Sequence, residues 1–241
     1  MLLNVFEKGK RQARKLEMPI EKIDPEVESR VRQILSKLEL EGWAIIMDAT
    51  EEILREVTKD GVIQALLQIG MSEENLTETM SSLATNYAKS RGAELVGKRL
   101  LPDGMIIDNP NSKWFIEQST RDLLRGDVTK AVEEGWSTNK LRDELEKNYA
   151  FSEERADMIA RTETAFADSR GNMIAYKESG VVSGKEWILG SEHDHDDECD
   201  ENVAAGVIAL GDSFPSGDNE APAHPNCICD VLPVLAEEAE A

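Results

Sequence analysis

The sequence has little positive charge. It contains 27 Lys and Arg residues against 48 Asp and Glu residues, a formal net charge of -21 at pH 7. A broad nucleic-acid-binding surface needs basic side chains, because contacts with the phosphates dominate its affinity. The composition therefore argues against bulk nucleic-acid binding as the main function.

The basic residues are also unevenly distributed along the chain. No Lys or Arg follows Lys185. Near the N-terminus, by contrast, five basic residues lie close together: Lys8, Lys10, Arg11, Arg14 and Lys15. The two ends of the chain should thus prefer different partners.

The sequence also lacks a long apolar run. No segment approaches the ~20 apolar residues that a membrane-spanning helix needs. The apolar residues of 1–6 precede the first charged residues, which reverses the order found in a signal peptide. We therefore expect no membrane partner, and we expect the protein to be made and folded in the cytoplasm. Its 241 residues, 40% of them hydrophobic, suffice for one large domain or two modest ones.

Familiar catalytic motifs are missing as well. The sequence has no Gly-rich phosphate loop, no Gly-x-Ser-x-Gly turn, and no Cys–His pair with a plausible orienting group. Arg161 and Glu163 lie about 200° apart around a helix, so they cannot act together on one face. Arg161 can instead meet Asp157 or Glu154 one turn earlier. We expect no enzyme, no catalytic residues and no residues that bind an organic cofactor.

The first hundred residues are predicted to be almost entirely helical. Asp24–Pro25 is a typical helix start, with Asp24 as the N-cap and Pro25 at the first helical position. Apolar residues then recur at three- and four-residue spacings towards Asp60–Gly61. Further helical segments are expected over 62–70 and, after a cap at Ser72, as far as residue 95.

A boundary is predicted after these helices, because residues 101–111 hold two Pro, one Gly and two Asn. A loop or a short strand between turns is expected there. Three helices should follow, over 114–134, from Ser137, and from Ser152 towards Gly180. Residues 185–189, 207–210 and 229–235 are typical of short strands. The sequence thus predicts an α+β fold: helical N-terminal and central parts with a small, loop-rich, β-containing C-terminal lobe.

The three Cys residues are few, odd in number and confined to the end of the chain. This is a poor basis for disulfides, whereas a metal site or plain thiols in a reducing cytosol fit the pattern. Zn²⁺ prefers four tetrahedral N and S ligands. Three thiolates and one imidazole would meet that preference: Cys199, His224, Cys227 and Cys229. A structural zinc would stabilise a lobe that has few apolar residues to bury. The alternative is a set of ordinary buried thiols and a packed His.

A second group of candidate ligands lies just before Cys199. His193, His195 and Asp197 resemble the His-x-His-x-Asp run of certain zinc hydrolases, but Glu198 stands where that run normally continues with His. A metal-dependent hydrolase would therefore be short of ligands. The same stretch fails as an EF-hand, because Cys199 occupies the Gly position. A solvated acidic loop is the simpler alternative.

The order of short motifs resembles one known family. Along the chain come 152–165 (Ser-Glu-Glu-Arg-Ala-Asp-Met-Ile-Ala-Arg-Thr-Glu-Thr-Ala), Lys-Glu-Trp at 185–187, Cys199, Gly-Val-Ile-Ala-Leu at 206–210, Phe-Pro-Ser-Gly at 214–217 and Pro-Ala-His-Pro-Asn-Cys-Ile-Cys at 222–229. This succession resembles the phage Mu F-like head morphogenesis domain over roughly residues 112–233. The chain departs from that pattern at Asn202, where members often have a second Cys, and at Ile228, where they often have a basic residue. The metal set must therefore be the four ligands named above, or must borrow Asp194 or His195.

The resemblance implies a minor head protein made beside the portal protein and present in a few copies per virion. It implies location in the phage head, after assembly in the host cytoplasm, and no established enzymatic activity. We expect an N-terminal helical attachment region (1–100), a Mu F-like domain (101–235) and an acidic tail (236–241). Expected partners are the portal protein and the major capsid or scaffold protein, with packaged DNA as a further partner of the basic N-terminal segment. The alternative is a metal-dependent hydrolase or delivered effector that uses the His/Asp-rich loop.

Overall fold

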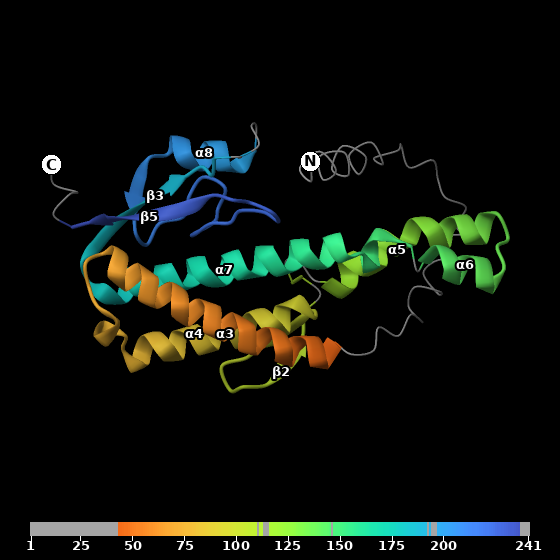
Figure 1. The fold of residues 1–241 in the computed structure, drawn as a ribbon, viewed down its shortest axis with the longest axis horizontal. Helices are drawn as coiled ribbons and strands as arrows, with labels where there is room; N and C mark the ends of the chain where they lie inside the picture. Colours follow the sequence, from red (N-terminus) through yellow and green to blue (C-terminus); the bar gives the residue numbers. More distant parts are fainter. Residues whose placement is uncertain are drawn as a thin grey trace. The chain divides into compact units, whose positions relative to one another are not determined.

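The computed structural model describes residues 43–109, 111–112, 116–145, 147–191, 193 and 197–236. The predicted helix start at Asp24–Pro25, the basic N-terminal segment and residues 237–241 lie outside the described residues. The described chain combines helices with two small antiparallel sheets (Figure 1). This arrangement confirms the predicted α+β class. The division of the sequence into 1–100, 101–235 and 236–241 stays a prediction.

The described residues pack into two compact units. The smaller one holds Arg121–Asn148, and the larger one holds the remaining described residues. The smaller unit contains most of α5 (Ile116–Glu133) and all of α6 (Thr138–Leu145). Its apolar interior includes Leu124, Val128 and Ala131. These two helices follow the predicted helices closely, and the hydroxyl of Ser137 accepts the N–H of Lys140 at the start of α6, as its predicted cap requires.

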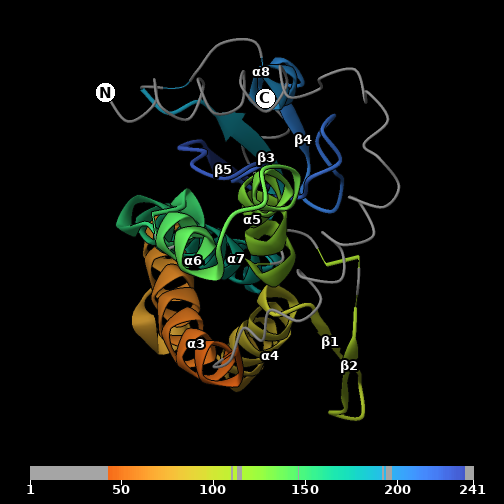
Figure 2. The ribbon, with the colours of Figure 1, turned by 90° about the vertical axis from the view of Figure 1, so that its right-hand side faces the viewer.

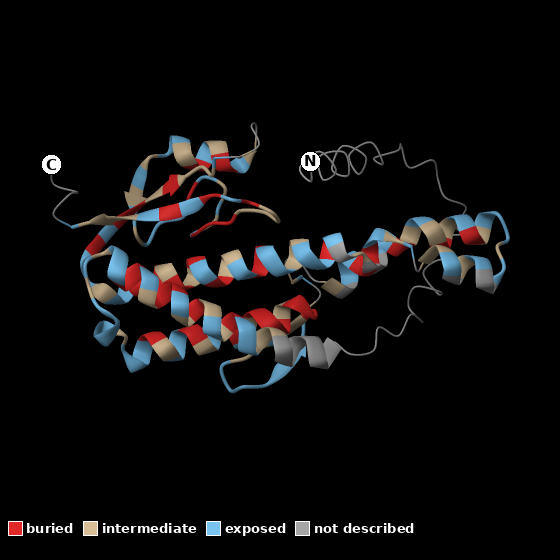
Figure 3. Cartoon of the chain, viewed as in Figure 1, coloured by how far each residue is buried: buried red, intermediate tan, exposed pale blue. Residues whose placement is uncertain are grey.

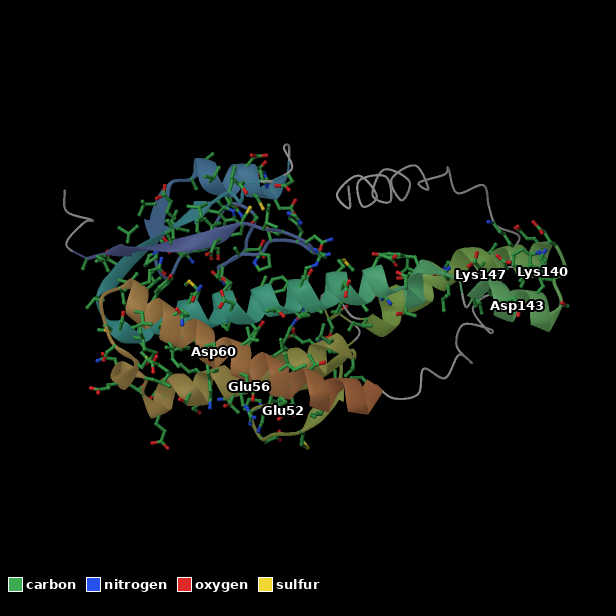
Figure 4. All side chains as sticks on the ribbon, in the orientation of Figure 1. Glu52, Glu56, Asp60, Lys140, Asp143 and Lys147 are labelled. Carbon is green, nitrogen blue, oxygen red and sulfur yellow. The ribbon has the colours of Figure 1, made fainter. Side chains whose placement is uncertain are left out.

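Three long helices form the body of the larger unit. They are α3 (Trp43–Gln68), α4 (Glu78–Leu95) and α7 (Glu153–Ser179), and α3 packs along both of the others (Figures 1 and 2). The buried positions line the faces where these helices meet (Figure 3). The outer face of α3 carries exposed acidic side chains at four-residue spacing, Glu52, Glu56 and Asp60 (Figure 4). Each helix is therefore amphipathic, as its sequence pattern predicts. None of the helices in the described ranges is long and apolar enough to cross a membrane.

Helix α3 continues through Asp60–Gly61, where the sequence suggested an end. The reason lies in its packing against α7. A Cβ atom on Gly61 would lie 2.5 Å from the carbonyl oxygen of Asp168, and one on Gly171 would lie 2.3 Å from that of Thr58. The two backbones thus approach so closely that only Gly fits at either crossing position.

The ends of the helices are set by local hydrogen bonds. Ser152 accepts a bond from the N–H of Arg155 at the start of α7, and Gly180 ends that helix in a left-handed conformation with φ 71°. Both positions were predicted. The cap of α4 was predicted wrongly, because Ser72 begins only the short helix η1 (Glu73–Asn75). The residue that caps α4 is Thr77, whose hydroxyl accepts the N–H of Met80.

The predicted loop after α4 contains a hairpin of β1 (Lys98–Leu100) and β2 (Ile106–Asp108), which Figure 2 shows beside α4. The C-terminal lobe contains a three-stranded antiparallel sheet with the order β4-β3-β5. Its strands are β3 (Val182–Ile188), β4 (Val207–Ala209) and β5 (Asp230–Leu235). All three fall at predicted strand positions. One further element, helix α8 (Glu198–Ala204), was not predicted.

The lobe is fixed to α7 by an apolar core and by buried charges. Trp187 is fully buried, and its ring meets that of Phe214 edge-on with centroids 5.0 Å apart. Glu220, which is also buried, pairs with Arg170 of α7 at 2.5 Å. Burial raises the pKa of the Glu220 carboxyl, while the charge of Arg170 opposes that rise. The lobe and α7 therefore share one interior.

Candidate metal centre

The side chains of all three cysteines are buried and meet at one end of the C-terminal sheet. Cys199 lies in the first turn of α8, where Asp197 caps the helix and accepts the N–H of Cys199 at 2.8 Å. Cys227 and Cys229 lie in the segment that leads into β5. The end of the sheet thus gathers residues that are well separated in sequence.

A tight turn places His224 beside Cys227. The N–H of Cys227 donates to the carbonyl oxygen of His224 at 3.1 Å, and Asn226 adopts a positive φ of 59°. A type II turn favours Pro at its second position and needs a residue that tolerates positive φ at its third. Pro225 and Asn226 meet both conditions, so the local sequence explains why the two candidate ligands face the same point.

The donor atoms have the spacing of a tetrahedral zinc site. Cys199 Sγ lies 3.6 Å from Cys227 Sγ and 3.6 Å from His224 Nε2. With Zn–S bonds of roughly 2.3 Å, two thiolates of a tetrahedral site are separated by roughly 3.8 Å, and a thiolate and an imidazole by slightly less. The residues therefore fit zinc in donor type and in spacing.

The donors form two groups that share Cys199. One contains Cys199, Cys227 and His224, and the other contains Cys199, Cys229 and His193, with the donor atoms of each group within 4.8 Å of one another. The structure thus places three of the four predicted ligands in the first group and the fourth, Cys229, in the second. His193 joins them, although the sequence placed it in a separate, hydrolase-like run. Asp194 and His195, the predicted substitutes, lie outside the described residues.

Among the three thiols, hydrogen bonds favour the thiolate form at Cys227. The bond to Cys227 raises the pKa of Cys199 far above its usual range, and the pKa of Cys229 is raised as well, since the lowering effect of its bond to Cys199 is outweighed by its bond to Cys227 and by burial. The bond from the Cys199 thiol holds the pKa of Cys227 far below its usual range, and the backbone N–H of Cys229 acts in the same direction. The bond between His224 and the Cys227 sulfur raises the pKa of His224 to about 9, against the opposing effect of burial. A metal ion would replace the protons that the thiols and this imidazole hold.

The ring of His224 is oriented for coordination through Nε2. Its Nδ1 lies 3.0 Å from the carbonyl oxygen of Pro225. Because a carbonyl oxygen can only accept, Nδ1 carries the proton and Nε2 is left to face Cys199. Backbone carbonyls hold zinc-bound imidazoles in this way in many proteins.

Two neighbouring residues of α7 connect the metal segment with the helical body. The hydroxyl of Thr162 accepts the N–H of Asn226 at 3.1 Å. The carboxylate of Glu163 forms two buried hydrogen bonds of 2.7 Å with the Arg91 guanidinium of α4. Arg161 points outwards and donates to the Asp157 carbonyl, one turn earlier as predicted. The sequence analysis missed the roles of Thr162 and Glu163, although both lie in a visible run of four polar residues between Ala160 and Ala165.

Replacing Thr162 with Val should lower the free energy of unfolding by about 1–2 kcal/mol, because the N–H of Asn226 loses its acceptor in a partly buried position. Denaturant titration of the purified protein measures this loss. Thr164→Val is the matched control, since Thr164 is exposed on the same helix, and it should change stability by less than about 0.5 kcal/mol. Equal effects of the two substitutions would show that Thr162 does not fix the metal segment.

Helix α7, strands β3 and β4, the first half of β5 and the Cys/His segment fall within the part of the chain that a known family matches. The matched residues are 122–232, slightly less than half of the chain. Over these residues the chain matches the family described as phage Mu protein F like protein. The match confirms the resemblance that the order of motifs predicted. No curated protein and no solved structure matches the chain.

Proposed function

We propose that this protein is a minor head protein that works by binding other head proteins and not by catalysis. The observation that supports the proposal most strongly is the family match over residues 122–232, which covers the whole Cys/His segment. The proposed partners are the portal protein and the major capsid or scaffold protein. The proposed place is inside the head or near the portal vertex, with a role in DNA packaging or ejection.

We also propose that Cys199, His224, Cys227 and Cys229 hold a structural zinc ion. Support comes from the 3.6 Å spacings, the burial of the thiols and the bond that orients His224. Four protein ligands leave no position for a reacting water, which agrees with a binding role. The alternative, a hydrolase or delivered effector, needs such an open position.

The head assignment is tested by quantitative mass spectrometry of DNA-filled heads purified from the phage or prophage that encodes the chain. A few copies of the chain per head are expected. Its absence from heads, in a lysate that contains it as free protein, would contradict the assignment.

The basic N-terminal segment is proposed as an attachment element. Removing residues 8–15, which include five Lys and Arg residues, should reduce incorporation into heads, because contact with an acidic partner or DNA needs this charge. The deletion should leave the denaturation curve of the purified protein unchanged. Substituting the same five positions with Gln separates the effect of charge from that of length. Normal incorporation of both variants would remove the segment from the attachment surface.

A further inference from the structure

His193 is a second imidazole at the proposed zinc site. Its side chain is only 6% exposed, and its Nδ1 lies 3.7 Å from Cys229 Sγ. It forms a group of possible metal ligands with Cys199 and Cys229. The separation of 3.7 Å again matches the edge of a zinc tetrahedron, which is roughly 3.6–3.8 Å for S and N donors. His193 therefore occupies the position of a ligand and not that of a neighbouring residue.

The outer nitrogens of the two imidazoles have different neighbours. His193 Nε2 lies 3.4 Å from Asp200 Oδ1, so a proton on Nε2 faces a carboxylate while Nδ1 faces the thiols. His224 has the opposite orientation, with Nδ1 on the Pro225 carbonyl and Nε2 towards Cys199. A carboxylate or carbonyl on the outer nitrogen is the usual arrangement of zinc-bound histidines. By this criterion the ring of His224 is prepared for coordination, and the ring of His193 has a carboxylate within ion-pair distance of its outer nitrogen.

The carboxylate of Asp197 touches both rings. Its Oδ2 lies 3.1 Å from His224 Nε2, and its Oδ1 lies 3.6 Å from His193 Nε2. Contact with Asp197 has different consequences for the two rings. To bind a metal through Nε2, His224 would have to give up its contact with Asp197, because Nε2 faces both Asp197 and Cys199. His193 could keep its contact with Asp197 through Nε2 while Nδ1 binds the metal. The side chain that caps α8 is thus placed to hold whichever imidazole does not coordinate.

Three thiols and two imidazoles are one donor more than a tetrahedral zinc accepts. We infer that a single zinc is bound by Cys199, Cys227 and Cys229, and that His193 and His224 are interchangeable fourth ligands. The inference rests on the proposed zinc and extends it by a residue that the sequence had not assigned to this site. The zinc would then keep four protein ligands when one imidazole dissociates, because the other takes its place. This exchange would protect the lobe from opening.

The test measures zinc per chain and zinc affinity, by elemental analysis and by competition with a chromophoric chelator, on the full-length protein. The variants are His193→Ala, His224→Ala, the double variant, and Ser191→Ala as a control in the same turn, where Ser191 is exposed. Each single variant should keep one zinc and bind it roughly 10- to 100-fold more weakly. The double variant should lose the zinc after dialysis against the chelator. Circular dichroism identifies the variants that are folded, and only these are compared. If an alanine variant fails to fold, His193→Gln or His224→Gln is used in its place.

Cobalt substitution gives an independent measure of the ligands. Co²⁺ in the wild-type protein and in both single variants should show visible bands of a tetrahedral thiolate site, and the double variant should lose or shift them. Complete loss of zinc in His224→Ala, with His193→Ala identical to wild type, would overturn the inference and leave the proposed Cys3His zinc intact. Wild-type protein without zinc would instead refute the zinc proposal itself, so the two failures are distinguishable.

Discussion

Replacing Gly171 with Ala should destabilise the protein by about 3 kcal/mol, since the added methyl group has no space between two helix backbones. Its Cβ would lie 2.3 Å from the Thr58 carbonyl oxygen and 2.8 Å from the Val62 nitrogen. Neither atom can move without shifting α3 as a whole. Ala is a better helix former than Gly by roughly 1 kcal/mol, so the steric effect must exceed this gain. Urea denaturation followed by circular dichroism measures the difference.

The matched control for this substitution is Gly126→Ala. Gly126 also lies within a helix, α5, but a Cβ there would meet no atom within 4 Å. The control should therefore be neutral or stabilising by up to about 1 kcal/mol. If Gly171→Ala behaved like Gly126→Ala, the close crossing of α3 and α7 would be wrong.

Replacing Cys199 with Ser should remove the zinc and destabilise the C-terminal lobe by at least about 3 kcal/mol. Cys199 is the thiol that both groups of donors share, so neither group keeps three donors without it. The free energy of metal binding contributes directly to folding when the unfolded chain has no formed site. The metal would be a main link between the segments that contain α8 and β5. The helical body should stay folded where Leu54, Ala88 and Ala167 form a core between α3, α4 and α7.

Elemental analysis, limited proteolysis and thermal denaturation together measure this effect. Wild-type protein treated with a strong chelator should reproduce the cleavage pattern of Cys199→Ser. The control is Ser213→Ala, which alters an exposed hydroxyl of the same lobe. A Cys199→Ser protein with an intact, protease-resistant lobe would show that packing alone holds it.

Elements that are defined by neighbouring residues were predictable from the sequence. Helix α7 begins after Ser152 and ends at Gly180 because a serine cap and a left-handed glycine act locally. Helix α8 was missed because it is only 7 residues long and lies among residues typical of loops. Its signal was Asp197 as a cap with acidic residues in the first turn. The continuation of α3 through Gly61 depends on α7 and could not be inferred from the local sequence.

The sequence predicted those ligands of the candidate site that could be recognised by their rare residue types alone. Three Cys and three His in the whole chain made Cys199, His224, Cys227 and Cys229 an obvious group. The position of His193 depends on strand pairing, because the register of β3 with β5 places Ile188 opposite Asp230 and so brings the turn after β3 beside Cys229. The Arg91–Glu163 pair joins residues 72 positions apart. Only the packing of α4 against α7 reveals it.

The proposed function makes this protein a head component that needs its metal-bound lobe for that role. The most direct test is to complement a deletion of its gene with wild-type, Cys199→Ser or Gly126→Ala protein, and to count copies of the chain in purified DNA-filled heads by mass spectrometry. The account predicts normal copy numbers for the wild type and for Gly126→Ala, and strong depletion of Cys199→Ser despite soluble expression. Heads that contain Cys199→Ser at the wild-type copy number would contradict the claim.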